Sequence, residues 1–336
     1  MITSHIVSNR NGREEINEVE LTVLIPMFNE AENIRNTVSM IKQVFNEFDK
    51  TWELLLVNDG STDSTLQIAQ EIEEEIDNLR VISYPVNSGR GKALRTGFEH
   101  AWGRYVVTID CDLTYSPDHI LRIYDELIDP EQMNDVVLGS AYMKGGQVVG
   151  VNPWRLFISK LGNKILAFTF PQPFKTSTCI LRGYRKEVLQ SLALDSEGKE
   201  IHLEILSKVC ALGFRVKEIP ATLSGRQRGK SKFKFRKTSV THLVFSIFER
   251  PILLFGLAGL FLIFSGFLIG CYIVWLRYLG TLNPGRPLIP FMIILLIMGS
   301  QFFCFAFVAS QNNHLRNQVY RLQKQIKRLQ LKKDLE

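Results

Sequence analysis

Two long apolar stretches in the C-terminal part of the chain constrain its structure more than any other feature of the sequence. Residues 251–276 and residues 287–310 contain no charged residue. Each stretch exceeds the roughly 20 residues that an α-helix needs to cross the hydrocarbon core of a bilayer. The sequence therefore predicts two transmembrane helices. The alternative is a pair of buried helices in a soluble protein.

The charges around these stretches predict the orientation of the chain. Residues 277–286, between the two stretches, carry only two cations, whereas basic residues gather at 226–237 and 316–333. Because Lys and Arg favour the cytosolic side of a membrane, we expect both termini and the N-terminal domain in the cytosol. The membrane would be the cytoplasmic membrane, or the ER membrane in a eukaryote. Residues 1–20 contain no apolar segment typical of a signal peptide.

The basic residues and the cysteines exclude some partners. The net charge is +6, and both basic blocks adjoin membrane-length apolar stretches. Anionic membrane lipids therefore fit these blocks better than nucleic acid does, and no nucleic-acid partner is expected. The five cysteines show no C-x-x-C spacing. This pattern indicates a reducing compartment and argues against a zinc site.

Between residues 21 and 140, short β-rich runs alternate with stretches of helical length and composition. Strands are predicted at residues 21–26, 54–57, 81–84, 105–109 and 135–139, and helices at 31–48, 64–76 and 92–102. This alternation predicts an α/β fold with a Rossmann-like, mostly parallel sheet. In such a sheet ligands bind at the carboxyl ends of the strands.

A polar cluster follows each of the first four predicted strands. Asn29-Glu30, Asn58-Asp59-Gly60 and Asn87-Ser88-Gly89 follow the first three, and Asp110-Cys111-Asp112 follows the fourth. In an extended strand side chains alternate between faces, so we expect both carboxylates to point the same way. They could then share a divalent cation or straddle a metal-bound diphosphate. The alternative is that both act as turn and helix-cap residues.

The remaining segments are less regular. Helices are predicted at residues 154–168 and 201–211, a short strand is predicted at 178–181, and 232–248 has the pattern of a helix in the membrane interface. In the tail, apolar residues follow a 4-3-4-3 spacing at Leu315, Val319, Leu322, Ile326 and Leu329. This spacing is typical of a coiled-coil seam and would make the protein a homo-oligomer, a dimer or a tetramer. A basic helix lying on the membrane is the alternative.

Four ordered segments resemble motifs of the family 2 glycosyltransferases with the GT-A fold. They are residues 25–34 (IPMFNEAENI), 57–63 (VNDGSTD), 87–92 (NSGRGK) and 110–113 (DCDL). Trp154-Arg155 and residues 226–232 (RQRGKSK) are similar to the branch of dolichyl-phosphate mannosyltransferases and bacterial polyprenyl-phosphate glycosyltransferases. This resemblance implies a membrane-bound inverting enzyme. It would move one sugar from a UDP- or GDP-sugar to a polyprenyl or dolichyl phosphate.

The resemblance also implies roles for individual residues. The donor and acceptor would be bound by Pro26, Phe28, Asn29, Glu30, Val57, Asp59, Lys92, Asp110, Cys111, Arg155, Arg226 and Lys232. Mg²⁺ or Mn²⁺ would be held by Asp112 as the principal ligand, with Asp110 and Thr114. The catalytic residues would be Asp112, Arg226 and Lys232.

With the resemblance included, the chain divides into five parts. These are a polar extension (1–20), a GT-A domain (21–225), a basic juxtamembrane segment with an interfacial helix (226–250), two transmembrane helices (251–310) and a basic coiled-coil-like tail (311–336).

Elementary chemistry agrees with the implied reaction. A departing nucleoside diphosphate gains negative charge, which a hard dication on oxygen ligands neutralises. A phosphomonoester has a second pKa near 6, so at pH 7 it is mostly a dianion and already nucleophilic. A general base is then dispensable, and guanidinium groups that orient the anion matter more.

Three positions depart from the family pattern. Asn58 stands where many relatives have Asp, Thr114 replaces a frequent Gln, and Ala141 replaces a frequent Arg whose charge Lys144 could supply. Two other readings are therefore retained. One is a processive polysaccharide synthase, although its Q-x-x-R-W motif is absent. The other is a catalytically silent membrane adaptor.

Overall fold

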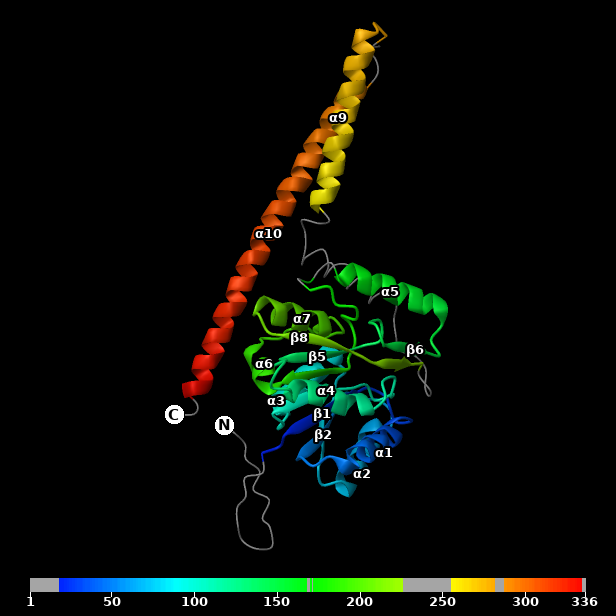
Figure 1. Cartoon of the computed structure of the whole chain (residues 1–336), viewed down its shortest axis with the longest axis vertical. Coiled ribbons are helices and arrows are strands. Elements are labelled where there is room, and N and C mark those ends of the chain that lie inside the picture. Colours follow the sequence, from blue (N-terminus) through cyan, green and yellow to red (C-terminus); the bar gives the residue numbers. More distant parts are fainter. Residues whose placement is uncertain (1–17, 168–169, 171, 226–254, 282–286, 334–336) are drawn as a thin grey trace. The chain divides into compact units, whose positions relative to one another are not determined.

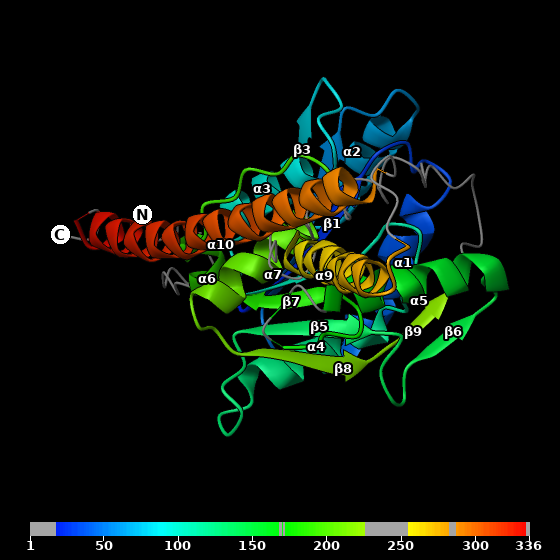
Figure 2. The same ribbon diagram turned by 90° about the horizontal axis from the view of Figure 1, so that it is seen from above.

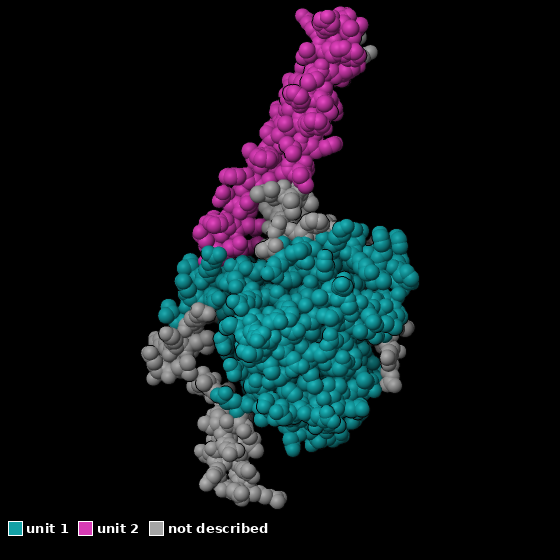
Figure 3. All heavy atoms as spheres, in the orientation of Figure 1, with its two compact units in different colours: residues 1–239, 320–336 teal, residues 240–319 magenta. Residues whose placement is uncertain are grey.

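The computed structural model describes residues 18–225 except 168, 169 and 171, and then residues 255–281 and 287–333. The chain forms two compact units, one of Met1–Ser239 with Tyr320–Glu336 and one of Val240–Val319 (Figure 3). The expected interfacial helix and the basic block before it lie outside the described residues.

The first unit is built on a seven-stranded sheet with the order β3-β2-β1-β4-β7-β5-β8 (Figure 1). The strands are β1 (Leu21–Met27), β2 (Trp52–Asp59), β3 (Leu79–Tyr84), β4 (Tyr105–Thr108), β5 (Val136–Ser140), β7 (Arg182–Arg185) and β8 (Val216–Pro220). The first four are parallel, β8 is parallel to β5, and β7 is antiparallel to both of its neighbours. This confirms the predicted α/β fold with a mostly parallel sheet.

Helices cover this sheet because its central strands are apolar on both sides. Every residue of β4 and nearly every residue of β1 and β2 is buried, which is typical of parallel strands enclosed on both faces. The helices within residues 18–225 are α1 (Ile34–Val44) with the 3₁₀ helix η1 (Phe45–Glu47), α2 (Thr65–Glu75), α3 (Arg90–His100), α4 (Asp118–Ile128), α5 (Pro153–Ala167), α6 (Lys186–Ser191) and α7 (Ile201–Ala211).

A second, two-stranded sheet pairs β6 (Gln147–Val149) with β9 (Thr222–Ser224) in parallel. An isolated bridge joins Tyr115, which follows the fourth-strand cluster, to Leu223 of β9. The end of the domain is thereby held beside the loop that contains the paired carboxylates.

The short strand predicted at residues 178–181 was wrong, because the strand in this region is β7 at Arg182–Arg185. The reason is the side chain of Arg182, which is fully buried. Its guanidinium donates hydrogen bonds to the carbonyl oxygens of Ser177 at 2.6 Å and Cys179 at 2.8 Å. These hydrogen bonds hold the irregular segment before β7 against the buried side chain of Arg182.

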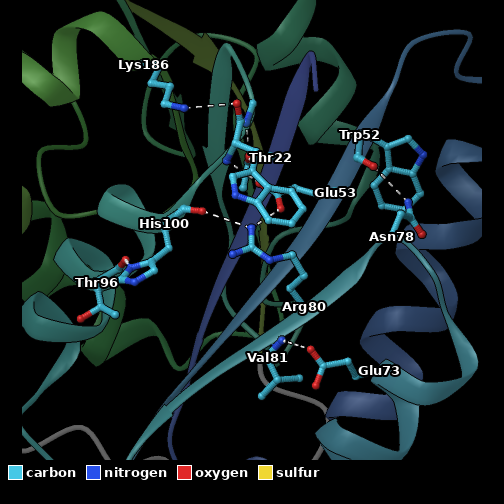
Figure 4. A network of polar contacts seen from close by, with 12 residues as sticks. Thr22, Trp52, Glu53, Glu73, Asn78, Arg80, Val81, Thr96, His100 and Lys186 are labelled. Carbon is cyan, nitrogen blue, oxygen red and sulfur yellow. Dashed lines mark hydrogen bonds and ion pairs between the residues drawn. The ribbon is translucent and has the colours of Figure 1, made fainter. Parts of the chain in front are cut away.

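A buried carboxylate joins the first strands at the edge of the sheet where β1 and β2 begin (Figure 4). Glu53 of β2 is only 2% exposed. It accepts hydrogen bonds from Thr22 Oγ1 and the Trp102 amide, both at 2.6 Å, and from Arg80 Nη1 at 2.8 Å. The Arg80 guanidinium also lies 3.3 Å from the centroid of the Trp102 ring. These contacts connect β1, β2, β3 and the turn before β4.

The described residues of the second unit include two helices, α9 (Leu257–Tyr278) and the N-terminal part of α10 (Leu288–Lys333). Both helices are long and apolar enough to cross a membrane. They approach closely where glycines face each other, since a Cβ on Gly259 would lie 2.7 Å from the Gly299 carbonyl oxygen. Small residues at such positions allow helix backbones to pack in a bilayer.

The helix α10 continues without a break from the second apolar stretch into the basic tail. The five seam residues named above are between 48% and 67% exposed. An exposed apolar seam is compatible with both the coiled coil and the membrane-surface helix, so the oligomeric state stays a prediction.

Substitution of Arg80 by Met should lower the stability of the full-length protein. The Arg80→Met variant retains the aliphatic stem but leaves Glu53, whose side chain is 3% exposed, without its hydrogen-bonded cation. We expect a loss of about 2 kcal/mol, less than the ~3–5 kcal/mol of a fully buried pair, because two neutral donors remain. Thermal unfolding in detergent, followed by near-UV circular dichroism, measures the change.

The matched control is Arg35→Met. Arg35 pairs with Glu71 on the surface, where the two side chains are 52% and 44% exposed. Exposed ion pairs contribute only ~0–1 kcal/mol. Equal losses for the two variants would contradict the importance given to the buried carboxylate.

Candidate active site

The parallel strands bring four loops of the predicted site to one edge of the sheet. β1 lies between β2 and β4, and Met27 at the end of β1 is in register with Asn58 near the end of β2. Asp59 in turn is in register with Tyr84, the last residue of β3. The polar clusters at the carboxyl ends of these four strands are therefore neighbours, as the fold prediction required.

The first two loops are joined by Asn29, which has a left-handed backbone with φ of 54°. The backbone amide of Asn29 donates a hydrogen bond to Ser61 Oγ at 2.9 Å. Its side-chain Oδ1 accepts one from the backbone amide of Thr62 at 2.7 Å. The next residue, Glu30, donates its amide to Thr65 Oγ1 at 2.7 Å, and its Oε2 accepts from Asn33 Nδ2 at 2.6 Å. Asn29 and Glu30 thus fix the β1 loop against the start of α2.

Asp59 organises the third loop. Its carboxylate accepts hydrogen bonds from the Ser88 amide at 2.7 Å and the Gly89 amide at 2.9 Å, and from Asn87 Nδ2 at 3.1 Å. Asp59 is 4% exposed, so these donors replace most of its contact with water. The same residue that the resemblance assigns to the nucleoside therefore holds the loop before α3 in place.

The strand argument for Asp110 and Asp112 was wrong. β4 ends at Thr108, so Asp110 lies in irregular backbone beyond the strand and Asp112 lies in the turn that follows, next to Leu113, which has a left-handed backbone with φ of 52°. The turn is stabilised by a hydrogen bond from the Thr114 amide to Asp112 Oδ1 at 3.1 Å. A turn does not impose the alternation of a strand, so the positions of the two carboxylates depend on the contacts of this loop.

The two carboxylates still interact through space. Burial raises the pKa of Asp110, and the negative charges of Asp112 and Glu30 raise it further. The cations Arg90 and Lys199 act in the opposite direction, and Arg90 Nη2 donates to Asp110 Oδ1 at 2.9 Å. Three carboxylates and two cations thus gather at the carboxyl end of β4.

Arg90 and Lys199 were missed by reasoning from the sequence. Arg90 lies inside the motif at residues 87–92, so its position was a usable signal, although the resemblance implied a role for Lys92 instead. Lys92 is exposed on α3. Lys199 had no signal, because it reaches the site only through the folding of the loop before α7.

That loop packs against the start of α3. The Gly91 amide donates to the Glu197 carbonyl oxygen at 2.6 Å. A Cβ on Gly89, whose φ is 96°, would lie 2.5 Å from the same oxygen. The glycines of the third motif therefore permit close approach of another segment of the chain.

Glu204 anchors the same loop from α7. Its carboxylate accepts from the Asp195 amide at 3.0 Å, the Ser196 amide at 2.9 Å and Lys208 Nζ at 2.6 Å. Burial opposes ionisation of this carboxylate, but the hydrogen bonds outweigh burial and lower the pKa of Glu204 below its ordinary value of 4.5. The carboxylate thus positions the segment that leads to Lys199.

The other predicted residues occupy varied positions. Pro26 and Phe28 are half-buried, while the side chains of Val57 and Cys111 are buried. Ala141 is also buried, and Lys144 is exposed. The backbone of Arg155 belongs to α5, but its side chain, like Arg226 and Lys232, lies outside the described part of the chain.

The oxygen donors of this edge fit a small divalent cation. Among the described residues, no three His, Cys, Asp or Glu side chains form a closed metal cage. Mg²⁺ and similar ions are usually held by one or two carboxylates and complete their shell with water and substrate phosphates. Asp112 is half-exposed and lies close enough to Asp110 to affect its ionisation. A cation would also relieve this repulsion between carboxylates.

Comparison with known proteins agrees with the fold and with the motifs. The family model "Glycosyl transferase family 2" matches residues 22–193. The undecaprenyl-phosphate 4-deoxy-4-formamido-L-arabinose transferase of Salmonella choleraesuis (strain SC-B67) is 26% identical over 309 residues, covering 89% of this chain and 90% of that protein.

Two solved structures with similar folds are complexes of glucosyl-3-phosphoglycerate synthase from Mycobacterium tuberculosis. One contains Mn²⁺, UDP and phosphoglyceric acid, with a TM-score of 0.51 and 21% identity, covering 68% of this chain and 78% of that chain. The other contains Mn²⁺, UDP-glucose and phosphoglyceric acid. Its TM-score is 0.51 and its identity is 20%, and the match covers 68% of this chain and 79% of that chain. At this identity the similarity establishes the fold.

The fold and the motif-bearing edge are those of a glycosyltransferase with the GT-A architecture. The chain belongs to glycosyl transferase family 2. The resemblance found in the sequence is thereby confirmed, as is the expectation that the protein is an enzyme of this class.

Substitution of Glu204 by Gln should destabilise the protein at neutral pH. Glu204→Gln removes the nearer counter-charge of Lys208, whose side chain is 7% exposed, leaves only Asp195 at 3.7 Å, and turns one acceptor into a donor that faces an amide. We expect a loss of about 1–3 kcal/mol, visible as a lower Tm. Because the folded-state pKa is lowered, this stabilisation is present above pH 4.5 and is lost as the pH falls further.

The measurement is Tm for wild type and variant across the pH range from neutral to acid. The gap between them should shrink below pH 4.5, the ordinary pKa of the group. Glu131→Gln, at an exposed position, is the control. A gap that stays constant with pH would contradict the role given to the ionised carboxylate.

Proposed function

We propose that this glycosyltransferase transfers one sugar from a nucleotide-sugar to a polyprenyl phosphate at a membrane surface, with inversion at the anomeric carbon. The main support for the proposal is the group of charged side chains beyond β4. Asp110 and Asp112 lie there with Arg90 and Lys199. Such a site suits a departing diphosphate. The Salmonella relative is named for transfer to undecaprenyl phosphate, and the present chain has two helices that could cross a membrane.

The donor diphosphate would be held at this edge. Asp112, with help from Asp110 and Thr114, would bind Mg²⁺ or Mn²⁺, which neutralises the charge that develops on the leaving diphosphate. Arg90 would hold Asp110 in position through its 2.9 Å hydrogen bond. Lys199 would add positive charge on the side of the α7 loop. The Mn²⁺ in the Mycobacterium structures supports the choice of a divalent cation.

The nucleoside would lie across the ends of β1 and β2. Pro26, Phe28 and Glu30 belong to the first loop, and Phe28 and Glu30 are half-buried, so part of each side chain is accessible to a ligand. Asp59 would act chiefly by fixing the loop at residues 87–89, since its carboxylate already accepts three hydrogen bonds from that loop. A ligand would then meet backbone groups held in a defined position.

The acceptor phosphate would be bound by Arg155, Arg226 and Lys232. The Ser224 amide donates to the Thr114 carbonyl oxygen at 2.8 Å, which holds the end of β9 beside the carboxylate turn. Arg226 is the second residue after Ser224 in the sequence. Guanidinium groups suit a phosphate dianion, which attacks the sugar without a general base. The lipid carrier would reach the site from the bilayer, with the catalytic domain on the cytosolic side.

The proposal predicts a lipid-linked product. Full-length protein, a panel of radiolabelled UDP- and GDP-sugars, Mg²⁺ or Mn²⁺ and a short polyprenyl phosphate should yield a chloroform-soluble labelled lipid. Asp112→Asn should lower turnover by at least about 100-fold, because neutralisation of the leaving group supplies several kcal/mol. Asp118→Asn, at a carboxylate 56% exposed on α4, should retain activity.

The other outcomes are equally distinct. A long polymer would indicate the polysaccharide synthase, and no product with any donor would favour the adaptor. Full activity of Asp112→Asn would refute the metal-binding role. Chelation by EDTA should stop the reaction, and addition of Mn²⁺ should restore it.

The basic block gives a second prediction. Arg226→Ala should leave donor binding unchanged but slow transfer by about 10–100-fold, since a charged hydrogen bond to the acceptor contributes ~1.5–3 kcal/mol. Arg228→Ala, a neighbouring cation without an assigned role, is the control. UDP- or GDP-sugar affinity and single-turnover rates separate binding from transfer. Equal rates for both variants would indicate that Arg226 has no specific role in transfer and is only one of the juxtamembrane charges.

A further inference from the structure

The helix α5 carries apolar side chains on two opposite faces. One face packs on the domain, where Leu166 is 2% exposed and Asn163 is 4% exposed. Asn163 Oδ1 accepts from the Ser177 amide at 2.9 Å, and Ser159 Oγ accepts from Tyr142 Oη at 2.8 Å. These contacts explain why the inner face of α5 is buried. They involve no residue of its outer face.

The outer face exposes three large apolar residues. Trp154 is 70% exposed, Phe157 is 57% exposed and Leu161 is 47% exposed. At 100° per residue these positions fall within about 60° of one another, opposite Asn163 and Leu166. The rings of Trp154 and Phe157 stack with centroids 5.8 Å apart. The helix lies at the periphery of the first unit (Figure 1, Figure 2), in agreement with the exposure of these three side chains.

The charges of α5 are all positive. The sequence of α5 contains no acidic residue, and Lys160 and Lys164 are exposed along one side of the stripe. Lys160 Nζ lies 5.9 Å from the centroid of the Tyr142 ring. Trp, Phe and Leu bordered by lysines are the composition of helices that lie at the level of lipid headgroups.

We propose that the outer face of α5 is a membrane-contact surface that lies in the headgroup region of an anionic bilayer. Trp154, Phe157 and Leu161 would enter the boundary between headgroups and acyl chains, and Lys160 and Lys164 would contact lipid phosphates. Because the same chain carries two helices of bilayer length, a bilayer is the surface that this face meets at the highest effective concentration. The proposal concerns a lipid contact and does not depend on the sugar or on the reaction.

Tryptophan fluorescence of the full-length protein in lipid nanodiscs tests this surface. The chain has four tryptophans, so the emission of Trp154 is obtained as the difference between wild type and Trp154→Phe. Phospholipids brominated in the upper acyl chain should quench this component about twofold, since interfacial helices lie ~5–10 Å into the boundary region. Acrylamide in the aqueous phase should have little effect on it.

Two other tryptophans provide controls. The component removed by Trp275→Phe, on α9, should be quenched by brominated lipid whatever α5 does. The component removed by Trp52→Phe should respond little to the lipid, because the Trp52 ring packs against Phe45 with centroids 4.2 Å apart.

Quenching of the Trp154 component by acrylamide alone would overturn the proposal, since the face would then lie in water. Protection from both quenchers would also overturn it, in favour of a protein covering the helix. In bilayers containing phosphatidylglycerol, Lys160→Gln combined with Lys164→Gln should reduce the lipid quenching, whereas in pure phosphatidylcholine it should not. An equal response in both lipids would overturn the contact with anionic headgroups. No sugar donor or acceptor is present, so the result is independent of the proposed reaction.

Discussion

The parallel pairing of β1 with both β2 and β4 is the constraint on which the rest of the catalytic domain depends. Parallel strands end at the same edge of a sheet, so the loops after these strands must be neighbours whatever their own conformations. The pairing is stabilised by burial of the strands on both faces, and at the opposite edge by the buried Glu53 carboxylate. The same sheet therefore provides both the stability and the position of the site.

Within the site, most of the order comes from hydrogen bonds between loops. Asp59 holds residues 87–89, Glu204 holds the loop that precedes α7, and the glycine-bearing start of α3 lies between them. This arrangement brings Arg90 and Lys199 to Asp110, where their positive charge opposes the effect of burial on its carboxyl. The structure thus places cations beside carboxylates at the carboxyl end of β4.

Much of this domain could be predicted from the sequence because local patterns indicate its strands and the loops of its site. Alternating apolar runs located β1 to β5 to within a few residues, and the motifs after four of the strands located the edge of the site. Other features depended on distant contacts. The strand near residue 180 is β7, after a segment that the buried guanidinium of Arg182 holds by hydrogen bonds, and β4 ends before both carboxylates. No local pattern contains such information.

By itself, therefore, the sequence determined the α/β class, the two membrane-length helices and the family, because periodicity, length and ordered motifs are local properties. The tertiary structure decided which side chains meet. It placed Arg90 on Asp110, brought Lys199 to the same edge and left the outer face of α5 exposed. These outcomes follow from the packing of segments far apart in the chain, whose contact energies depend on the whole fold.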